Sequence, residues 1–208
     1  FIFGNLAGKR VMAMQGRSHY YVGYDMKTVT FPVRVMRALG VETLIVSNAA
    51  GGMNKEFQVG DVMIITDHIN LFPENPLRGK NYKELGDRFP AMTEAYSHRL
   101  VKLADEIGAE KGIRLMQGVY VGTTGPTFET PAEYEYFRII GGDAVGMSTV
   151  PEVIVARHGG MEVFGLSVIT DLGGKDITEV PSHEEVQMAA KTAEPVTKDL
   201  VRSLVERM

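Results

Sequence analysis

Apolar side chains follow two alternating patterns along the chain. Residues 42–47 (ETLIVS) form a short β-branched run, whereas residues 28–39 carry apolar side chains at helical spacing and end at Gly40. The strands predicted on this basis cover residues 9–14, 42–47, 62–68, 114–124, 143–146 and 162–170. The predicted helices cover residues 28–39, 94–108, 131–140, 150–158 and 183–207.

This alternation predicts an α/β fold with a mixed, mostly parallel central sheet flanked by helices. Residues 70–92 are rich in Pro, Gly and Asn without a steady period, so we expect a long surface loop there. The chain has 208 residues and no repeat or linker, which indicates a single domain over residues 1–208.

Composition narrows the classes of function. The chain has 22 basic and 26 acidic residues, a net charge of −4, which argues against a nucleic-acid partner. No apolar run approaches the roughly 18 residues that a membrane helix needs, so we expect no membrane partner. The absence of cysteine excludes disulfides, thiolate catalysis and cysteine–zinc sites, and it agrees with a reducing compartment.

Three predicted helices begin with the capping pattern S/T-x-x-E, at Thr130, Thr149 and Ser182. Capping alone could explain these residues. A polar or glycine-rich segment precedes each cap, however, and such segments follow the carboxyl ends of strands, where α/β sheets bind ligands. A helix N-terminus at that position also favours an anion.

Two segments near the predicted strands contain candidate anion ligands. Arg17, Ser18, His19 and Tyr21 follow the first strand closely, and an arginine fork suits phosphate oxygens. The alternative is an ordinary polar loop. Residues 47–52 (SNAAGG) could offer backbone N–H groups to an anion, or could form a simple glycine turn.

Residues 125–130 (GPTFET) suit a flat heterocycle. Phe128 can stack on a ring, and Glu129 can accept hydrogen bonds from ring N–H groups. Glu133 could be only the capping partner, but Glu129 lies before the helix and capping does not explain it.

Further candidates follow the last strands. Ser148 lies beside a helix start and can bind an anion, while Met147 could cover a sugar face or simply pack in the core. Asp171 ends a strand, where it could serve a site or a turn, and His183 lies in the first turn of the last helix. The candidates together suit a ligand with an anion at one end and a nitrogen heterocycle at the other.

In these residues the chain resembles the trimeric purine nucleoside phosphorylases. The resemblance covers essentially the whole chain and is highly specific. The segments that carry it are MQGRSHYY, TFPVRV, NAAGG, GDVMIITDHIN, NPLRG, RFPAM, GPTFETPAE, GMSTVPEVIVARH and SHEEV.

The resemblance implies a pentosyltransferase of purine salvage. The family reaction cleaves a purine (deoxy)ribonucleoside with inorganic phosphate, giving the free base and (deoxy)ribose 1-phosphate. Phosphate is then a co-substrate, and neither a metal nor an organic cofactor is expected. The resemblance also implies a cytoplasmic homotrimer.

It assigns roles to individual residues as well. Catalysis would involve Glu129, Asp171 and His19. Phosphate would be held by Arg17, Ser18, His19, Ser148 and the backbone N–H of Ala49. Ribose would be held by Tyr21, Met147, His183 and, from a neighbouring subunit, Phe89. The base would contact Phe128, Glu129, Val145, Gly146, Thr170 and Asp171.

Two departures leave alternatives open. Asp171 stands where members specific for 6-oxopurines usually have Asn, so the resemblance also allows a 5′-methylthioadenosine or adenosine phosphorylase. Family members further have an N-terminal segment with a phosphate-binding turn, and the sequence given begins after it, so we expect this part to be missing. A protein that truly lacked it could be a non-catalytic nucleoside-binding protein.

Overall fold

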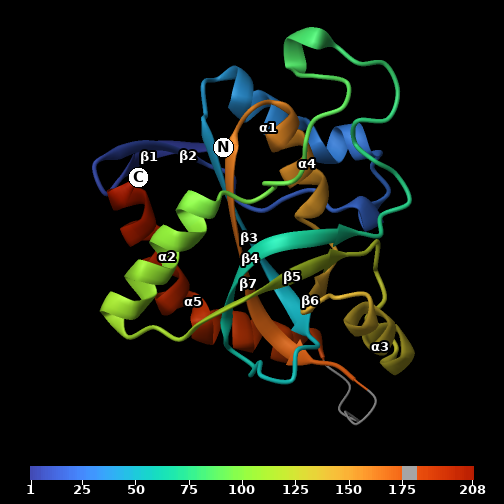
Figure 1. Cartoon of the computed structure of the whole chain (residues 1–208), viewed down its shortest axis with the longest axis vertical. Helices are drawn as coiled ribbons and strands as arrows, with labels where there is room; N and C mark the ends of the chain where they lie inside the picture. Colours follow the sequence, from blue (N-terminus) through green and yellow to red (C-terminus); the bar gives the residue numbers. More distant parts are fainter. Residues whose placement is uncertain (175–181) are drawn as a thin grey trace.

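The strands form a small hairpin and a closed barrel (Figure 1). The computed structural model describes residues 1–174 and 182–208. β1 (Ile2–Leu6) and β2 (Lys9–Ala13) pair only with each other, as an antiparallel two-stranded sheet. The barrel has the order β3-β6-β5-β4-β7. Its strands are β3 (Thr43–Gly52), β4 (Val62–Asn70), β5 (Leu115–Gly122), β6 (Ala144–Gly146) and β7 (Glu162–Leu172).

Two sets of parallel strands make up this barrel. β4, β5 and β6 run in one direction, and β3 and β7 run in the other. Antiparallel contacts between β4 and β7 and between β3 and β6 join the sets. The β3–β6 seam consists of the pairs Gly51–Val145 and Gly52–Ala144. Because β6 meets only the last two residues of β3, the carboxyl ends of strands from both sets lie near this seam.

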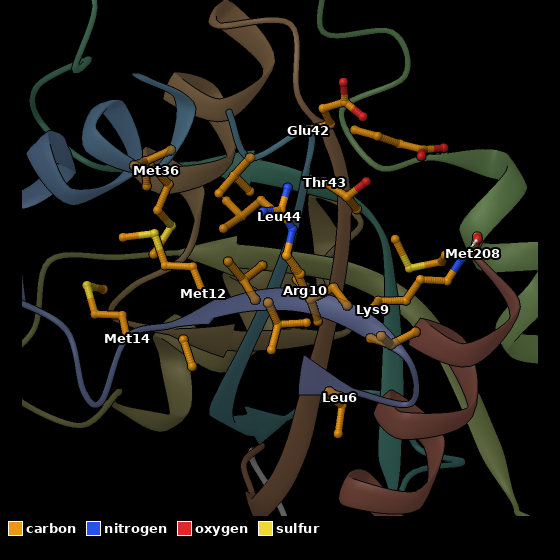
Figure 2. Close-up of a pocket in the computed structure, with 18 of the residues that line it drawn as sticks. Leu6, Lys9, Arg10, Met12, Met14, Met36, Glu42, Thr43, Leu44 and Met208 are labelled. Carbon is orange, nitrogen blue, oxygen red and sulfur yellow. Dashed lines mark hydrogen bonds between the residues drawn. The ribbon is translucent and has the colours of Figure 1, made fainter. Parts of the chain in front are cut away.

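A cleft of about 1340 Å³ separates the hairpin from the barrel (Figure 2). Met12 and Arg10 of β2 line one side, and Thr43 and Leu44 of β3 line the other. The Lys9 ammonium group donates to the backbone oxygen of Met208 at 2.9 Å, which ties the hairpin to the end of the chain.

Helices pack on the outside of the barrel. The helices are α1 (Met26–Ala38), α2 (His98–Lys111), α3 (Pro131–Ile139), α4 (Val150–His158) and α5 (His183–Arg207). The short 3-10 turns Tyr20–Val22 and Lys83–Leu85 lie in the connections. In the described residues no helix is long and apolar enough to cross a membrane.

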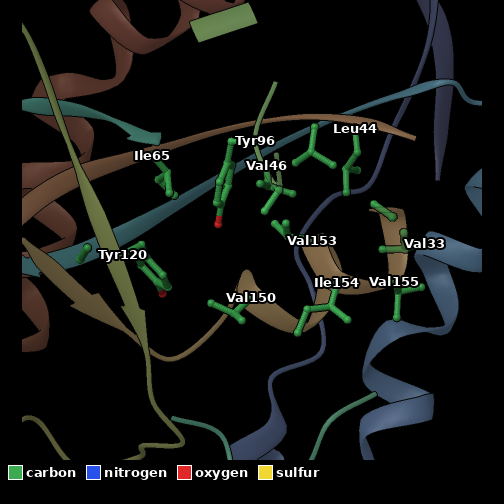
Figure 3. Packing of buried hydrophobic residues seen from close by; sticks show 14 of the residues in the cluster. Val33, Leu44, Val46, Ile65, Tyr96, Tyr120, Val150, Val153, Ile154 and Val155 are labelled. Atoms are coloured by element: carbon green, nitrogen blue, oxygen red, sulfur yellow. The ribbon is translucent and has the colours of Figure 1, made fainter. Parts of the chain in front are cut away.

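Three apolar clusters fix the helices to the strands. The largest lies between the barrel and the helices α1 and α4, and contains Val46, Tyr120 and Val153 (Figure 3). A second joins α2 and α5 to β4 and β7, and a third packs Phe137 of α3 against Val145. Burial of apolar area at about 25 cal/mol per Å² makes these clusters the main source of stability.

The predicted α/β fold with a mixed sheet flanked by helices is confirmed, and three of its five strand pairings are parallel. Closure of the sheet into a barrel and the strand β1 were not predicted. The alternative interpretation of residues 47–52 as a glycine turn is wrong: β3 continues to Gly52, so this segment is extended backbone. Its pairing with β7 overrides the weak strand preference of glycine and alanine.

Candidate active site

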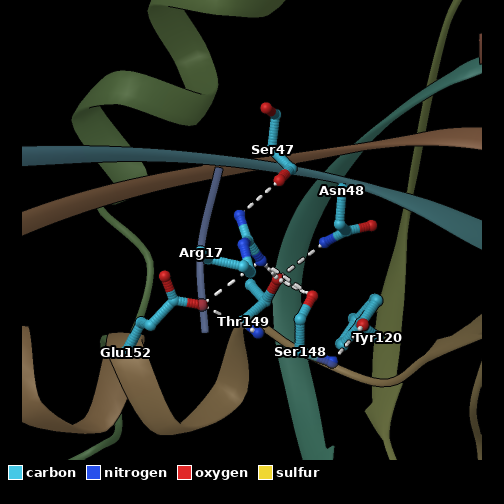
Figure 4. A network of polar contacts seen from close by, with 7 residues as sticks. All are labelled: Arg17, Ser47, Asn48, Tyr120, Ser148, Thr149 and Glu152. Carbon is cyan, nitrogen blue, oxygen red and sulfur yellow. Dashed lines mark hydrogen bonds and ion pairs between the residues drawn. The ribbon is translucent and has the colours of Figure 1, made fainter. Parts of the chain in front are cut away.

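Arg17 joins three separate segments of the chain (Figure 4). Its Nη1 atom donates to Ser148 Oγ at 2.7 Å and to Thr149 Oγ1 at 3.0 Å. Its Nη2 atom donates to the backbone oxygen of Ser47, in β3, at 2.6 Å. The structure therefore brings together Arg17 and Ser148, two of the residues predicted to bind phosphate.

The turn before α4 is held by an ion pair between the half-buried Arg17 and the buried Glu152. Arg17 Nη1 lies 3.2 Å from Glu152 Oε2, and that carboxylate also accepts the backbone N–H of Thr149 at 3.1 Å. Thr149 is fully buried and has a φ of 71°, a strained conformation for a β-branched residue. Asn48 Nδ2 donates to Thr149 Oγ1 at 2.9 Å, which adds a further restraint.

His19, predicted to bind phosphate, and Tyr21, predicted to bind ribose, follow Arg17 closely in the sequence. Their rings stack with centroids 4.8 Å apart and an interplanar angle of 17°. Burial, followed by the charge of Arg17, lowers the pKa of His19. His19 is therefore neutral at pH 7 and offers one donor and one acceptor rather than a positive charge. Tyr21 is 41% exposed, and Ser18 is half-buried.

The β3–β6 seam assembles most of the residues predicted to line the base. Gly51 of β3 pairs with Val145 on one side and with Asp171 of β7 on the other. Thr170 is buried next to Asp171, and Gly146 ends β6. Asp171 lies within β7, so its alternative interpretation as a turn residue is wrong.

Glu129 lies before α3 and is half-buried. Thr123 Oγ1 donates to its carboxylate at 3.4 Å. Burial raises the pKa of Glu129, and the nearby charge of Asp171 adds to this effect. The two acids are therefore close enough to interact electrostatically. Phe128, the preceding residue, is 45% exposed and its ring is open to a ligand.

The residues predicted to bind ribose differ in how far they are exposed. Met147 is half-buried, and its sulfur packs so tightly on Gly125 that a Cβ there would lie 2.2 Å away. Phe89 is 88% exposed, with the Arg88 guanidinium group 5.8 Å from its ring centroid. Ala49, whose backbone N–H was predicted to bind phosphate, is exposed on β3. The side chain of His183 lies outside the described part of the chain.

Several residues of this region were not predicted as site residues. Thr149 and Glu152 were identified only as a helix cap, although a cap beside Ser148 was the signal for them. Tyr134, on α3, donates its hydroxyl to Asp171 at 3.0 Å. Nothing in the sequence pattern distinguishes Tyr134 from an ordinary helical core residue.

Comparison with known proteins identifies the class. The model of the Phosphorylase superfamily matches residues 1–206, so the chain belongs to this superfamily. Purine nucleoside phosphorylase 1 of Geobacillus stearothermophilus is 56% identical over 201 residues, which cover 97% of this chain and 72% of that protein. Purine nucleoside phosphorylase of Rattus norvegicus is 50% identical, with 99% and 73% covered.

Solved structures agree with this result. Schistosoma purine nucleoside phosphorylase in complex with guanosine superimposes with a TM-score of 0.95 at 45% identity, covering 99% of this chain and 77% of that one. A purine nucleoside phosphorylase in complex with ribose-1-phosphate gives 0.89 at 43% identity, with 99% and 74% covered. Within the superfamily, the chain is a member of the purine nucleoside phosphorylases, which are pentosyltransferases.

The ion pair between Arg17 and Glu152 yields a prediction on stability. We expect Arg17→Ala to lower the free energy of unfolding by about 3 kcal/mol, because it leaves a buried carboxylate without its cation. In a Glu152→Gln background the same substitution should cost clearly less. Denaturant unfolding measures both values.

Arg78→Ala is the matched control, because the ion pair of Arg78 with Glu74 is exposed and 4.0 Å long. Its loss should cost less than about 1 kcal/mol. Equal costs of Arg17→Ala in the two backgrounds would show that Glu152 is not its energetic partner.

Proposed function

We propose that this protein cleaves purine nucleosides with phosphate, chiefly inosine, guanosine and their deoxy forms, and that it serves purine salvage. The products are the free base and (deoxy)ribose 1-phosphate. The observation that carries this proposal is the order of groups along residues 145–148. Val145 lies in the seam, and Gly51 of β3 stands between it and Asp171. Gly146 and Met147 follow, and Ser148 accepts a hydrogen bond from Arg17. A base, a sugar and an anion can therefore be bound in sequence along four residues.

Arg17 and Ser148 are proposed to hold phosphate, with His19, Ser18 and the N–H of Ala49 beside them. A guanidinium group and a hydroxyl are suitable donors for phosphate oxygens. The neutral His19 contributes a hydrogen bond rather than charge, since burial lowers its pKa. No organic cofactor or metal enters this proposal, because phosphate itself is the nucleophile.

In the proposed reaction a phosphate oxygen attacks the anomeric carbon as the bond to the purine nitrogen breaks. Positive charge develops on the sugar, and negative charge spreads into the departing base. Glu129 and Asp171 orient the base through its N–H groups, and Phe128 covers its face. Positioning of the reactants and stabilisation of the developing charge supply the rate enhancement.

Met147, Tyr21 and His183 are proposed to hold the ribose, and Phe89 to reach the ribose of a neighbouring subunit in a homotrimer. The 88% exposure of Phe89 supports this, because it leaves the ring accessible to a neighbouring subunit. A cytoplasmic location is part of the same proposal.

Phosphorolysis assays test the proposed function directly. We expect phosphate-dependent release of base from inosine and guanosine, measured beside adenosine and 5′-methylthioadenosine with and without phosphate. Cleavage of the 6-amino substrates alone would assign the protein to the methylthioadenosine or adenosine phosphorylases. No cleavage of any substrate, with nucleoside still bound, would indicate a binding protein.

Glu129→Gln separates catalysis from stability. We expect turnover to fall by about 100-fold, the usual scale for losing one charge-stabilising contact. The pKa of Glu129 is raised in the folded state, so folding disfavours its charged form. This lowers the free energy of unfolding at a pH above the pKa of the folded state. The effect is absent at a pH below the pKa of the unfolded state. The substitution should therefore raise the Tm at pH 7 but not near pH 4. Near-normal turnover would remove Glu129 from the chemistry.

Phe89→Ala tests the contact between subunits. We expect the nucleoside KM to rise by about tenfold, because the free energy of one aromatic contact corresponds to about that factor in affinity. The Tm should not change. Phe31→Ala is the matched control, because Phe31 is 63% exposed on α1.

Mixed oligomers make this test specific. A Phe89→Ala subunit supplies Glu129, and a Glu129→Ala subunit supplies Phe89. Co-expression of the two variants should restore sites with a normal KM. If co-expression gives only the raised KM, Phe89 does not act across the interface.

A further inference from the structure

Tyr134 and Thr170 hold the carboxylate of Asp171 from both sides. The Tyr134 hydroxyl donates to Asp171 Oδ2 at 3.0 Å, and Thr170 Oγ1 donates to Asp171 Oδ1 at 2.9 Å. Tyr134 is 5% exposed and Thr170 is also 5% exposed. Both donors are therefore fixed in the protein interior, and neither oxygen of Asp171 is free to turn toward another group without losing a hydrogen bond.

Two glycines create the space that the Tyr134 ring occupies. A Cβ on Gly51 would lie 2.3 Å from the Tyr134 hydroxyl oxygen, and a Cβ on Gly173 would lie 2.1 Å from the ring. Gly51 belongs to the β3–β6 seam and Gly173 follows β7. The ring thus fills a slot between two backbone segments, and the slot directs its hydroxyl at Asp171.

This arrangement determines what Asp171 can offer a ligand. Hydrogen bonds donated to both oxygens fix the orientation of the carboxylate, and an ionised carboxylate can only accept. Burial, with the charge of Asp171 as a second cause, raises the pKa of Tyr134, so its hydroxyl stays protonated and remains a donor. The free lone pairs of Asp171 therefore favour an N–H group, such as the exocyclic amine of a 6-aminopurine, over a carbonyl oxygen at the same position.

We propose that Tyr134 is a positioning residue for base specificity: it fixes Asp171 as a hydrogen-bond acceptor, and so increases the acceptance of 6-aminopurines relative to 6-oxopurines. This inference rests on the proposed contact between Asp171 and the base. Without the tyrosine hydroxyl, Asp171 is held, among the described residues, by Thr170 alone, and its carboxylate can rotate away from the position in which it accepts from a 6-amino group.

Tyr134→Phe tests the proposal, because it keeps the ring in its slot and removes only the hydroxyl. We expect the ratio of kcat/KM for adenosine to that for inosine to fall about fivefold, the scale of one hydrogen bond. The ratio of the affinities for adenine and hypoxanthine, measured by calorimetry, should fall in the same direction. The affinity measurement needs no turnover, so it gives a result whether or not phosphorolysis is detected.

Asp171→Asn provides the matched background. It should lower the 6-amino to 6-oxo affinity ratio by itself, and adding Tyr134→Phe to it should change the ratio by less than about twofold. Gly173→Ala, which displaces the ring, should reproduce the effect of Tyr134→Phe in the unmodified chain.

Three outcomes would overturn the inference. An unchanged ratio in Asp171→Asn would show that Asp171 does not contact the base, which also refutes that part of the proposed site. A changed ratio in Asp171→Asn with none in Tyr134→Phe would leave the site intact and exclude the role of Tyr134. A lower Tm in Tyr134→Phe with no change in either ratio would show a purely structural role.

Discussion

The antiparallel seam between β3 and β6 is the constraint on which the rest of this structure depends. Its pairs, Gly51–Val145 and Gly52–Ala144, join strands that run in opposite directions. In an ordinary antiparallel pair the two carboxyl ends lie far apart. Here β6 has only the residues Ala144–Gly146, so its end lies next to the seam and leads directly into the turn before α4, while the end of β7 pairs with β3 on the other side of the seam. The candidate groups for base, sugar and anion can converge only because this contact is short.

Near the seam, contacts hold one residue in an unfavourable backbone conformation and keep one carboxylate in a partly buried position. Thr149 keeps a positive φ because Glu152, Arg17 and Asn48 bind its polar atoms. Glu129 keeps a carboxylate in a half-buried position that favours its neutral form. Such local costs of about 1–3 kcal/mol each are tolerated when the surrounding core is well packed. The three apolar clusters around the barrel provide that packing.

The sequence pattern predicted the bounds of individual helices well, but it did not predict which strands pair with each other. The ranges 150–158 and 183–207 match α4 and α5, because a capping box marks each start and apolar periodicity defines the length. Barrel closure was missed because it depends on which strands meet, and periodicity carries no information on partners. Residues 47–52 became a strand through pairing with β7, which local composition could not indicate.

The same limit applies to the candidate site. Arg17 and Ser148 were recognised separately as anion ligands, and the structure brings them to 2.7 Å. The sequence did not indicate a role for Tyr134, because its hydrogen bond to Asp171 joins residues that are 37 positions apart. The space for its ring is left by two glycines from other segments. Residues that bind a ligand leave a pattern in the chain, whereas residues that position them are visible only in three dimensions.

The packing of Met147 on Gly125 has a consequence for the chemical durability of the protein. The chain contains no cysteine and 12 methionines, so sulfur oxidation by peroxides falls on thioethers alone. The Met147 sulfur lies at the turn between β6 and α4, where Gly125 leaves no room for another atom on that side. A sulfoxide oxygen there would put a polar group against the turn that carries Ser148. Oxidation of this one methionine would thus disturb a proposed phosphate ligand, and a methionine sulfoxide reductase would reverse the change.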